Sequence, residues 1–158
     1  MKIVRVVAAV IKSINEKGQT IIFATQRGYG DMKDGWEFPG GKIEEGEDKK
    51  TALIREIKEE LNANIEIDSY FATIDYTYPN FHMIMDCYIC SIDDFVINEE
   101  IHDEAKWLTK DELDSVNWLA ADEKIVNKLK IYLSSKIAVS ACLLGDNCRY
   151  NGKNNYNE

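Results

Sequence analysis

Hydrophobic runs of two kinds divide most of the chain into expected strands and helices. Short runs rich in Val, Ile and aromatic residues predict strands, the first two of which form a hairpin. The expected strands cover residues 2–14, 20–25, 65–78, 82–92 and 105–108. Between the second and third of them, residues 28–35 combine glycine with aspartate, which predicts a loop.

Apolar residues at helical spacing predict the helices. Residues 48–61 repeat this spacing, with Asp48 suited to cap the N-terminus and Asn62 suited to a left-handed stop. Residues 122–134 predict a final amphipathic helix, and a capping box over residues 109–112 predicts a brief helix before it. This order of elements predicts an α+β fold, with helices packed on a mostly antiparallel or mixed sheet.

Length and charge narrow the class of protein. The chain has 158 residues, with 28 acidic against 19 basic side chains and a formal net charge of −9. This length suits one domain with a short extra segment, and it allows a sizeable hydrophobic core. The acidic surplus argues against a nucleic-acid polymer as partner, because such a partner needs a basic surface. It does not argue against a small phosphorylated substrate that arrives with its own metal ion.

Several features predict a cytoplasmic protein without a membrane partner. The longest apolar run, residues 6–11, is far shorter than the roughly 20 residues of a membrane span. The first residues pass directly into an expected strand and show no secretory cleavage pattern. Cys87 and Cys90 resemble a metal-binding pair, but positions three apart on a strand point to opposite faces. We therefore interpret them as ordinary buried thiols, typical of a reducing compartment.

Acidic side chains are concentrated in the segment from Gly40 to Leu61. Glu56, Glu59 and Glu60 lie at i, i+3 and i+4 of the expected helix, so their carboxylates share one side of it and repel one another. A hard divalent cation such as Mg²⁺, which prefers oxygen ligands, would compensate this charge. The alternative is a solvated acidic helix that follows a turn.

The loop before this helix can add ligands to such a site. Gly40 and Gly41 follow Pro39 and allow the backbone to approach closely, so that a main-chain carbonyl can join the ligand set. Glu47, at the start of the helix, could reach the same cluster.

The spacing of these residues resembles the Nudix box of the Nudix hydrolases. Gly41, five residues, Glu47, seven residues and then the run REIKEE over 55–60 reproduce this pattern. One position departs from it, because Asn62 stands where the family has a glycine, and asparagine is the best substitute in a left-handed cap. The resemblance extends over roughly residues 2–133, including 36–39, 78–90 and 118–129. It is strongest to the mutator-type branch, which includes oxidised-nucleotide and CTP-type enzymes.

The resemblance implies the Nudix fold, an α/β/α sandwich, and Mg²⁺-dependent hydrolysis of (deoxy)nucleoside triphosphates to monophosphate and pyrophosphate. Such an enzyme cleans the nucleotide pool of oxidised or cytosine-type nucleotides, and Mn²⁺ is an acceptable substitute for Mg²⁺. Arg55 would orient the glutamates by ion pairing. The implied metal ligands are Gly40, Glu47, Glu56, Glu59 and Glu60.

One of these glutamates, or an acid in a later loop, would activate the attacking water. The family's loop acid lies a few residues before Trp107, where four acids compete: Glu99, Glu100, Asp103 and Glu104. We favour Glu100. His102 lies among them, but a single loop histidine is more often incidental.

Five residues are candidates for binding the nucleoside. Arg27 and Phe38 match family positions near the nucleotide, and Tyr78 and Trp118 could supply stacking faces, although each of these aromatics taken alone is more often a core residue. Asp122 stands where the enzyme specific for 8-oxoguanine has an asparagine. Since an ionised aspartate only accepts hydrogen bonds, it suits an exocyclic amine, and we predict a preference for amino-bearing bases, cytosine first. A protonated aspartate could also donate. Alternatively, or in addition, Asp122 caps the last helix.

The last residues of the chain do not belong to this pattern, so we place the Nudix domain at residues 1–135. Residues 136–144 predict a fresh strand, and the following glycine loop is typical of the start of a domain. The stretch SACLLGDNCRYNG resembles the start of a bacterial family related to thiouracil desulfurases, in which Cys142 would be one ligand of an iron–sulfur cluster. Residues 136–158 offer too few thiolates for a cluster of their own. We therefore interpret them as the truncated start of a second domain.

Two other functions compete with this interpretation. One is a non-catalytic nucleotide-sensing module, which would not need the repulsive set of three glutamates. The other is a Nudix hydrolase that acts on ADP-ribose or dinucleoside polyphosphates, against which the extended similarity to the mutator-type branch argues. The expected partner in each case is a small nucleotide, and the sequence leaves open whether the protein is a monomer or a homodimer.

Overall fold

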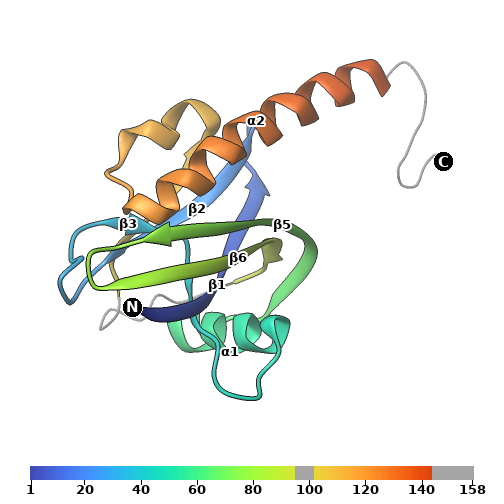
Figure 1. Ribbon diagram of the computed structural model, residues 1–158. Coiled ribbons are helices and arrows are strands. Elements are labelled where there is room, and N and C mark those ends of the chain that lie inside the picture. Colours follow the sequence, from blue (N-terminus) through green and yellow to red (C-terminus); the bar gives the residue numbers. More distant parts are fainter. Residues whose placement is uncertain (95–101, 144–158) are drawn as a thin grey trace. The chain divides into compact units, whose positions relative to one another are not determined.

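The computed structural model describes residues 1–94 and 102–143, and it describes only the backbone of residues 136–143. The chain divides into two compact units, residues 1–126 and 127–158, and every side-chain contact discussed below lies in the first. In chain order the elements are β1 (Lys2–Ile14), β2 (Thr20–Arg27), β3 (Trp36–Glu37), β4 (Gly40–Lys42), α1 (Lys49–Leu61), β5 (Ile65–Thr77), β6 (Phe81–Ile92), β7 (His102–Thr109), the 3₁₀ helix η1 (Lys110–Ser115) and α2 (Ala120–Leu143) (Figure 1).

The sheet is mixed, with strand order β3-β2-β1-β6-β5. β1 pairs in parallel with β6 over residues 2–11, and β6 pairs antiparallel with β5. The end of β1 forms the predicted hairpin with β2, which also pairs with β3 and β7. β4 pairs antiparallel with β1 and so places the glycine segment beside the centre of the sheet. The predicted α+β class, a mixed sheet flanked by helices, is confirmed.

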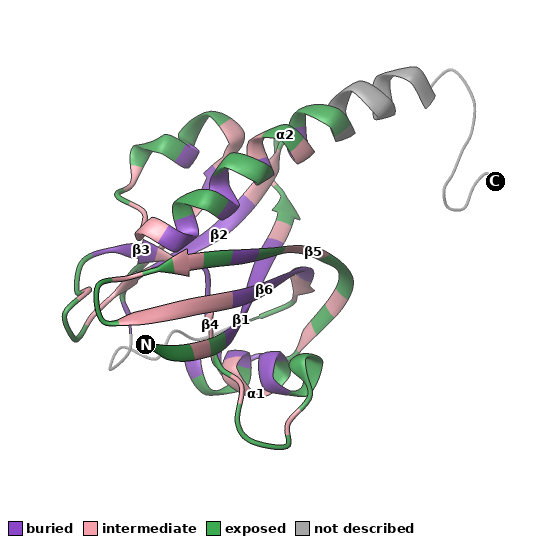
Figure 2. Ribbon diagram, in the orientation of Figure 1, coloured by how far each residue is buried: buried purple, intermediate pink, exposed green. Residues whose placement is uncertain are grey.

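Both faces of β1 are buried, which explains its nearly continuous apolar sequence. Alternate residues from Val7 to Ile11 pack against α1, and the residues between them are also buried (Figure 2). The core on the α1 side contains Val7, Ala9, Ile11, Phe23, Ala52, Leu53, Ile57, Leu61, Ala63, Tyr88 and Cys90. Cys87 and Cys90 are both buried free thiols, as predicted, and the pKa of each is raised by burial, to about 12 for Cys90.

The ends of α1 lie where the sequence predicts them. The side chain of Asp48 accepts a hydrogen bond from the backbone N–H of Thr51 at 2.8 Å. Asn62 has a left-handed φ of 50°, and its backbone N–H donates to the carbonyl of Lys58 at 3.0 Å. These two caps set where the acidic side of the helix begins and ends.

The expected strand over residues 136–144 is wrong, because the backbone continues as α2 to Leu143. An apolar run of this length does not distinguish a strand from a helix, and no glycine or proline separates it from the helix before it. The prediction that residues 136–158 begin a second domain stays a prediction, since residues 144–158 and the side chain of Cys142 lie outside the part of the chain that the structure describes. In the described part of the chain, no helix has both the length and the apolar character needed to cross a membrane.

Candidate active site

A glycine segment lies directly against the acidic side of α1. Gly40 and Gly41 pair with Ala8 and Val7 of β1. A Cβ atom on Gly40 would overlap the carbonyl oxygen of Val7, and one on Gly41 would overlap the carboxylate of Glu56. Gly40 therefore has to be glycine for β4 to approach the sheet this closely, whereas a side chain at Gly41 would displace the carboxylate of Glu56.

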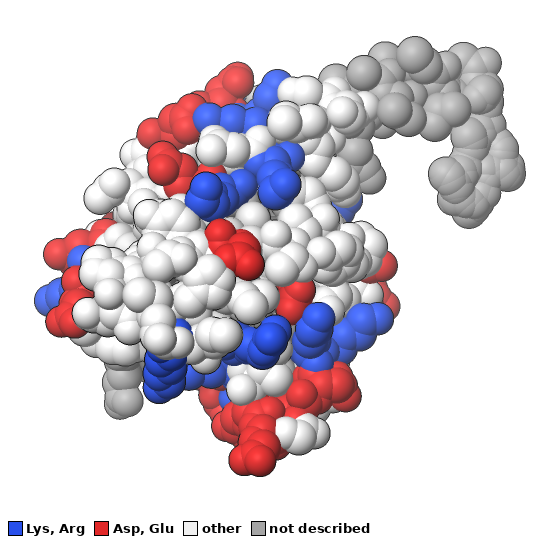
Figure 3. Space-filling view, viewed as in Figure 1, with Lys and Arg blue, Asp and Glu red and all other residues white. Residues whose placement is uncertain are grey.

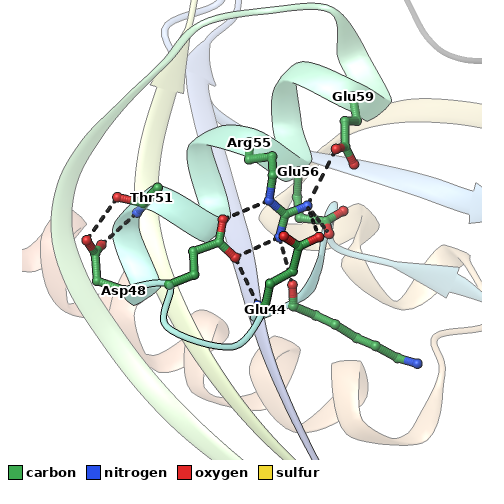
Figure 4. A network of polar contacts seen from close by, with 8 residues as sticks. Glu44, Asp48, Thr51, Arg55, Glu56 and Glu59 are labelled. Carbon is green, nitrogen blue, oxygen red and sulfur yellow. Dashed lines mark hydrogen bonds and ion pairs between the residues drawn. The ribbon is translucent and has the colours of Figure 1, made fainter.

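Arg55, on α1, is the centre of a network of ion pairs with nearby glutamates (Figure 4). Its Nε and Nη2 atoms lie 2.8 and 2.9 Å from the two carboxylate oxygens of Glu47. Its Nη1 atom lies 2.9 Å from Glu56 and 3.5 Å from Glu59, and Nη2 also donates to the carbonyl of Lys42 at 3.0 Å. Hydrogen bonds from Arg55 lower the pKa of Glu47 to about 2, so Glu47 stays ionised in this network.

The glutamates of α1 share one side of the helix but occupy different environments. Glu60 is buried, with 8% of its surface exposed. Its Oε1 atom accepts hydrogen bonds from the backbone N–H of Gly40 at 3.3 Å and from Nε2 of His102 at 3.1 Å. The side chain of Glu59 is 56% exposed and lies at the outer edge of the Arg55 network.

Glu56 lies between these two environments. Burial raises its pKa, the charges of Glu60 and Glu59 raise it further, and Arg55 opposes the shift. The repulsion expected from the spacing of the three glutamates therefore acts on Glu56, Arg55 offsets it, and burial keeps the pKa raised.

The chemistry of this donor set fits Mg²⁺, because it consists of carboxylates beside a part-exposed backbone segment. Among residues 1–94 and 102–143, no three His, Cys, Asp or Glu side chains form a ready-made metal cluster. Arg55 instead holds an oxygen of Glu56, and Gly40 and His102 hold one of Glu60. In each of these two glutamates, the other carboxylate oxygen is the one left for a cation. On the face shown in Figure 3, acidic side chains gather at the end where the loop before α1 lies, with basic side chains next to them.

A cluster of aromatic residues lies at Phe38, two residues before the glycine segment. The ring of Phe38 stacks on Trp118, with centroids 4.7 Å apart. The backbone N–H of Phe38 donates to Oδ1 of Asp122 at 3.0 Å, and the hydroxyl of Tyr78 accepts from the N–H of Ala121 at 3.0 Å. The structure thus brings four of the five predicted nucleoside-binding residues together.

Arg27, the fifth, is held by an internal ion pair. Its Nη2 atom lies 2.8 Å from Oε1 of Glu37, and its guanidinium lies over the ring of Tyr29 at 4.9 Å. Burial raises the pKa of Glu37, and Arg27 opposes that shift. Since Phe38 follows Glu37 directly, this ion pair fixes the start of the segment that joins the two clusters.

Asp122 is not the cap of α2, because the helix begins at Ala120 and places Asp122 in its first turn. The predicted cap is wrong because α2 starts at Ala120, two residues before residue 122, where the amphipathic pattern predicts the helix to begin. Burial raises the pKa of Asp122 to about 8, against hydrogen bonding from Phe38. The side chain is therefore protonated at neutral pH.

The sequence interpretation missed two residues of the site. His102, which the sequence predicts to be incidental, is buried against Glu60, and the sequence pattern predicts no role for Glu37. The pairing of Glu37 with Arg27 could have been anticipated from the charge of two residues on adjoining strands. Of the acids that compete for the role of base, Asp103 and Glu104 are exposed on β7, and Glu99 and Glu100 lie outside the described residues.

Comparison with known proteins identifies the family. Residues 4–129 match the NUDIX domain, and the chain belongs to this family. Over 136 residues it is 32% identical to an 8-oxo-dGTP diphosphatase of Haemophilus influenzae, a match that covers 81% of this chain and 92% of that protein. It is 38% identical over 73 residues to a CTP pyrophosphohydrolase of Escherichia coli, covering 46% of this chain and about half (51%) of that protein.

A solved structure shows the same fold. A MutT NUDIX hydrolase of Burkholderia pseudomallei superposes with a TM-score of 0.71 at 20% identity, covering 81% of this chain and 98% of that one. The predicted membership in the Nudix hydrolases, which act on pyrophosphate bonds of nucleotide derivatives, is confirmed.

Proposed function

We propose that this protein hydrolyses (deoxy)nucleoside triphosphates with Mg²⁺, or Mn²⁺ in its place, to a monophosphate and pyrophosphate. The observation that carries the proposal is the segment over residues 36–42. Its glycines lie against the acidic side of α1, and its Phe38 lies in the aromatic cluster with Asp122. One short segment thus links the acidic side of α1 with the aromatic cluster, which supports a site for phosphate chemistry beside a site for a base.

In this proposal some residues bind the cation and others orient those that bind it. Glu56, Glu59, Glu60 and the carbonyl of Gly40 would hold the cation, which when bound neutralises the polyphosphate and orients the attacking water. Arg55 holds Glu47 with two hydrogen bonds and restricts Glu56 through a third. We assign the general base to Glu100.

Base selection is assigned to the aromatic cluster. The buried ring of Phe38 stacks on the part-exposed ring of Trp118, and the hydroxyl of Tyr78 contacts the first turn of α2. Oδ1 of Asp122 accepts from Phe38, which leaves its other oxygen for the base. That oxygen can accept a hydrogen bond from the exocyclic amine of cytosine whether or not it carries a proton.

A panel of substrates tests the proposed reaction. We expect CTP, dCTP or 8-oxo-dGTP to yield monophosphate and pyrophosphate in equal amounts with Mg²⁺, and no product when EDTA removes the metal. ADP-ribose and a dinucleoside polyphosphate serve as competitors from other Nudix classes. Preferred turnover of either competitor, or release of single orthophosphates from a triphosphate, would contradict the proposal. Binding of nucleotides without turnover would favour a sensing module.

The substitution Asp122→Asn tests base selection. The amide nitrogen can only donate, so the variant loses an acceptor for an exocyclic amine while its oxygen keeps the bond to Phe38. We expect kcat/KM for CTP and dCTP to fall at least about tenfold relative to 8-oxo-dGTP, a change of about 1.4 kcal/mol. Unchanged ratios among the three substrates would refute the role of Asp122.

A further inference from the structure

His102 enters the site because β7 contains a bulge. Trp107 and Ala105 of this strand pack against the core on the α1 side. Regular alternation would place Asp103 next on that face. The pairing of β7 with β2 shifts by one residue beside Arg27, so that His102 stands opposite Arg27 and Asp103 is exposed. Bulges commonly re-aim a side chain in this way next to active sites.

His102 is buried and forms a hydrogen bond with Glu60. Only 2% of its surface is exposed. Its Nε2 atom lies 3.1 Å from Oε1 of Glu60, whereas Nδ1 has no hydrogen-bond partner among the described residues. Burial of a polar atom without a partner is unfavourable, so packing alone does not account for a histidine here.

The contact restricts how Glu60 can act. Oε1 of Glu60 already accepts from two donors, the N–H of Gly40 and Nε2 of His102. One donor comes from β4 and the other from β7, so the carboxylate is held from two elements. The second oxygen, Oε2, is the one left for a cation.

We infer that His102 is a positioning residue that fixes Glu60 for binding of the divalent cation through Oε2. This inference rests on the proposed metal-dependent function. Hydrogen-bond partners of a metal-binding carboxylate typically contribute about 10- to 100-fold to metal affinity. Removal of the His102 donor should therefore weaken metal binding by an amount in this range.

Three variants distinguish a positioning role from a structural one. The amide nitrogen of His102→Gln is as many bonds from the backbone as Nε2 of histidine, whereas that of His102→Asn is one bond shorter. His102→Leu removes the donor altogether. His82, the chain's other histidine, lies part-exposed on β6 with its Nε2 atom beside a carboxylate oxygen of Asp75, so His82→Asn is the matched control.

The readout is Mn²⁺ binding without nucleotide, followed by the electron paramagnetic resonance signal of free Mn²⁺. We expect the dissociation constant to rise at least about tenfold in His102→Asn and His102→Leu and to stay within about threefold of wild type in His102→Gln and His82→Asn. In turnover assays the Asn variant should lose kcat with little change in KM for the nucleotide.

The outcomes separate this inference from the proposed function. If wild type binds Mn²⁺ and hydrolyses triphosphates but His102→Asn binds Mn²⁺ equally tightly, only the role of His102 is overturned. Failure of His102→Gln to restore binding would likewise overturn it, and this pair decides the question even if His102→Leu does not fold. If wild type neither binds Mn²⁺ nor turns over nucleotide, the proposed function fails and the inference falls with it.

Discussion

Replacement of Glu59 by Gln should lower kcat by at least about a hundredfold, equivalent to roughly 3 kcal/mol of transition-state stabilisation. Glutamine preserves the shape of the side chain but removes the charge that a cation requires. The Glu59 side chain is 56% exposed, so the fold should tolerate the change. Pyrophosphate release at saturating Mg²⁺ measures the effect, and thermal unfolding verifies that the melting temperature stays within about 2 °C of wild type.

The control for this variant is Glu66→Gln, which makes the same chemical change at an exposed position of β5. It should leave both activity and melting temperature unchanged. Equal turnover by wild type and Glu59→Gln would remove Glu59 from the catalytic set. A loss of activity accompanied by unfolding would instead place Glu59 among residues that stabilise α1.

The acidic helix could be predicted from the sequence because its determinants are local. Asp48 and Asn62 cap α1 through contacts with residues three and four positions away. The spacing of its glutamates also follows from helix geometry alone. What local pattern could not predict is that Glu60 would be buried while Glu59 stays exposed, because that difference depends on β4 and β7 packing against one end of the helix.

His102 shows the same limit more sharply. A β-bulge depends on the register in which two strands distant in the chain pair with each other. Nothing in residues 102–109 alone predicts which residue of β7 is the extra one, left without a partner on β2. The strand predicted over residues 136–144 failed for a related reason. The apolar composition of residues 136–144 is compatible with a strand or a helix, and the segment continues the helix that precedes it.

The stability of the protein should depend on pH through Asp122. Its pKa is about 8 in the folded protein, compared with an ordinary value of 3.8, because the side chain is buried, and the hydrogen bond from the N–H of Phe38 opposes the shift. The folded state therefore holds a proton that the unfolded state releases above about pH 4. This stabilising contribution is complete below that pH and is lost progressively as pH rises to about 8, since stability falls wherever the folded state binds more protons.

The variant Asp122→Asn removes this titration while its amide oxygen still accepts from Phe38. Its melting temperature should exceed that of wild type by at least about 5 °C at pH 9, as expected for a difference of a few kcal/mol, and the gap should narrow steadily towards pH 5. Exposed Asp68, on β5, provides the control, because Asp68→Asn should shift the melting temperature little and equally at both pH values. Thermal unfolding by circular dichroism from pH 5 to 9 measures these differences. A gap that stays constant or shrinks as pH rises would show that Asp122 is ionised in the folded protein, so that its oxygens offer a base hydrogen-bond acceptors only.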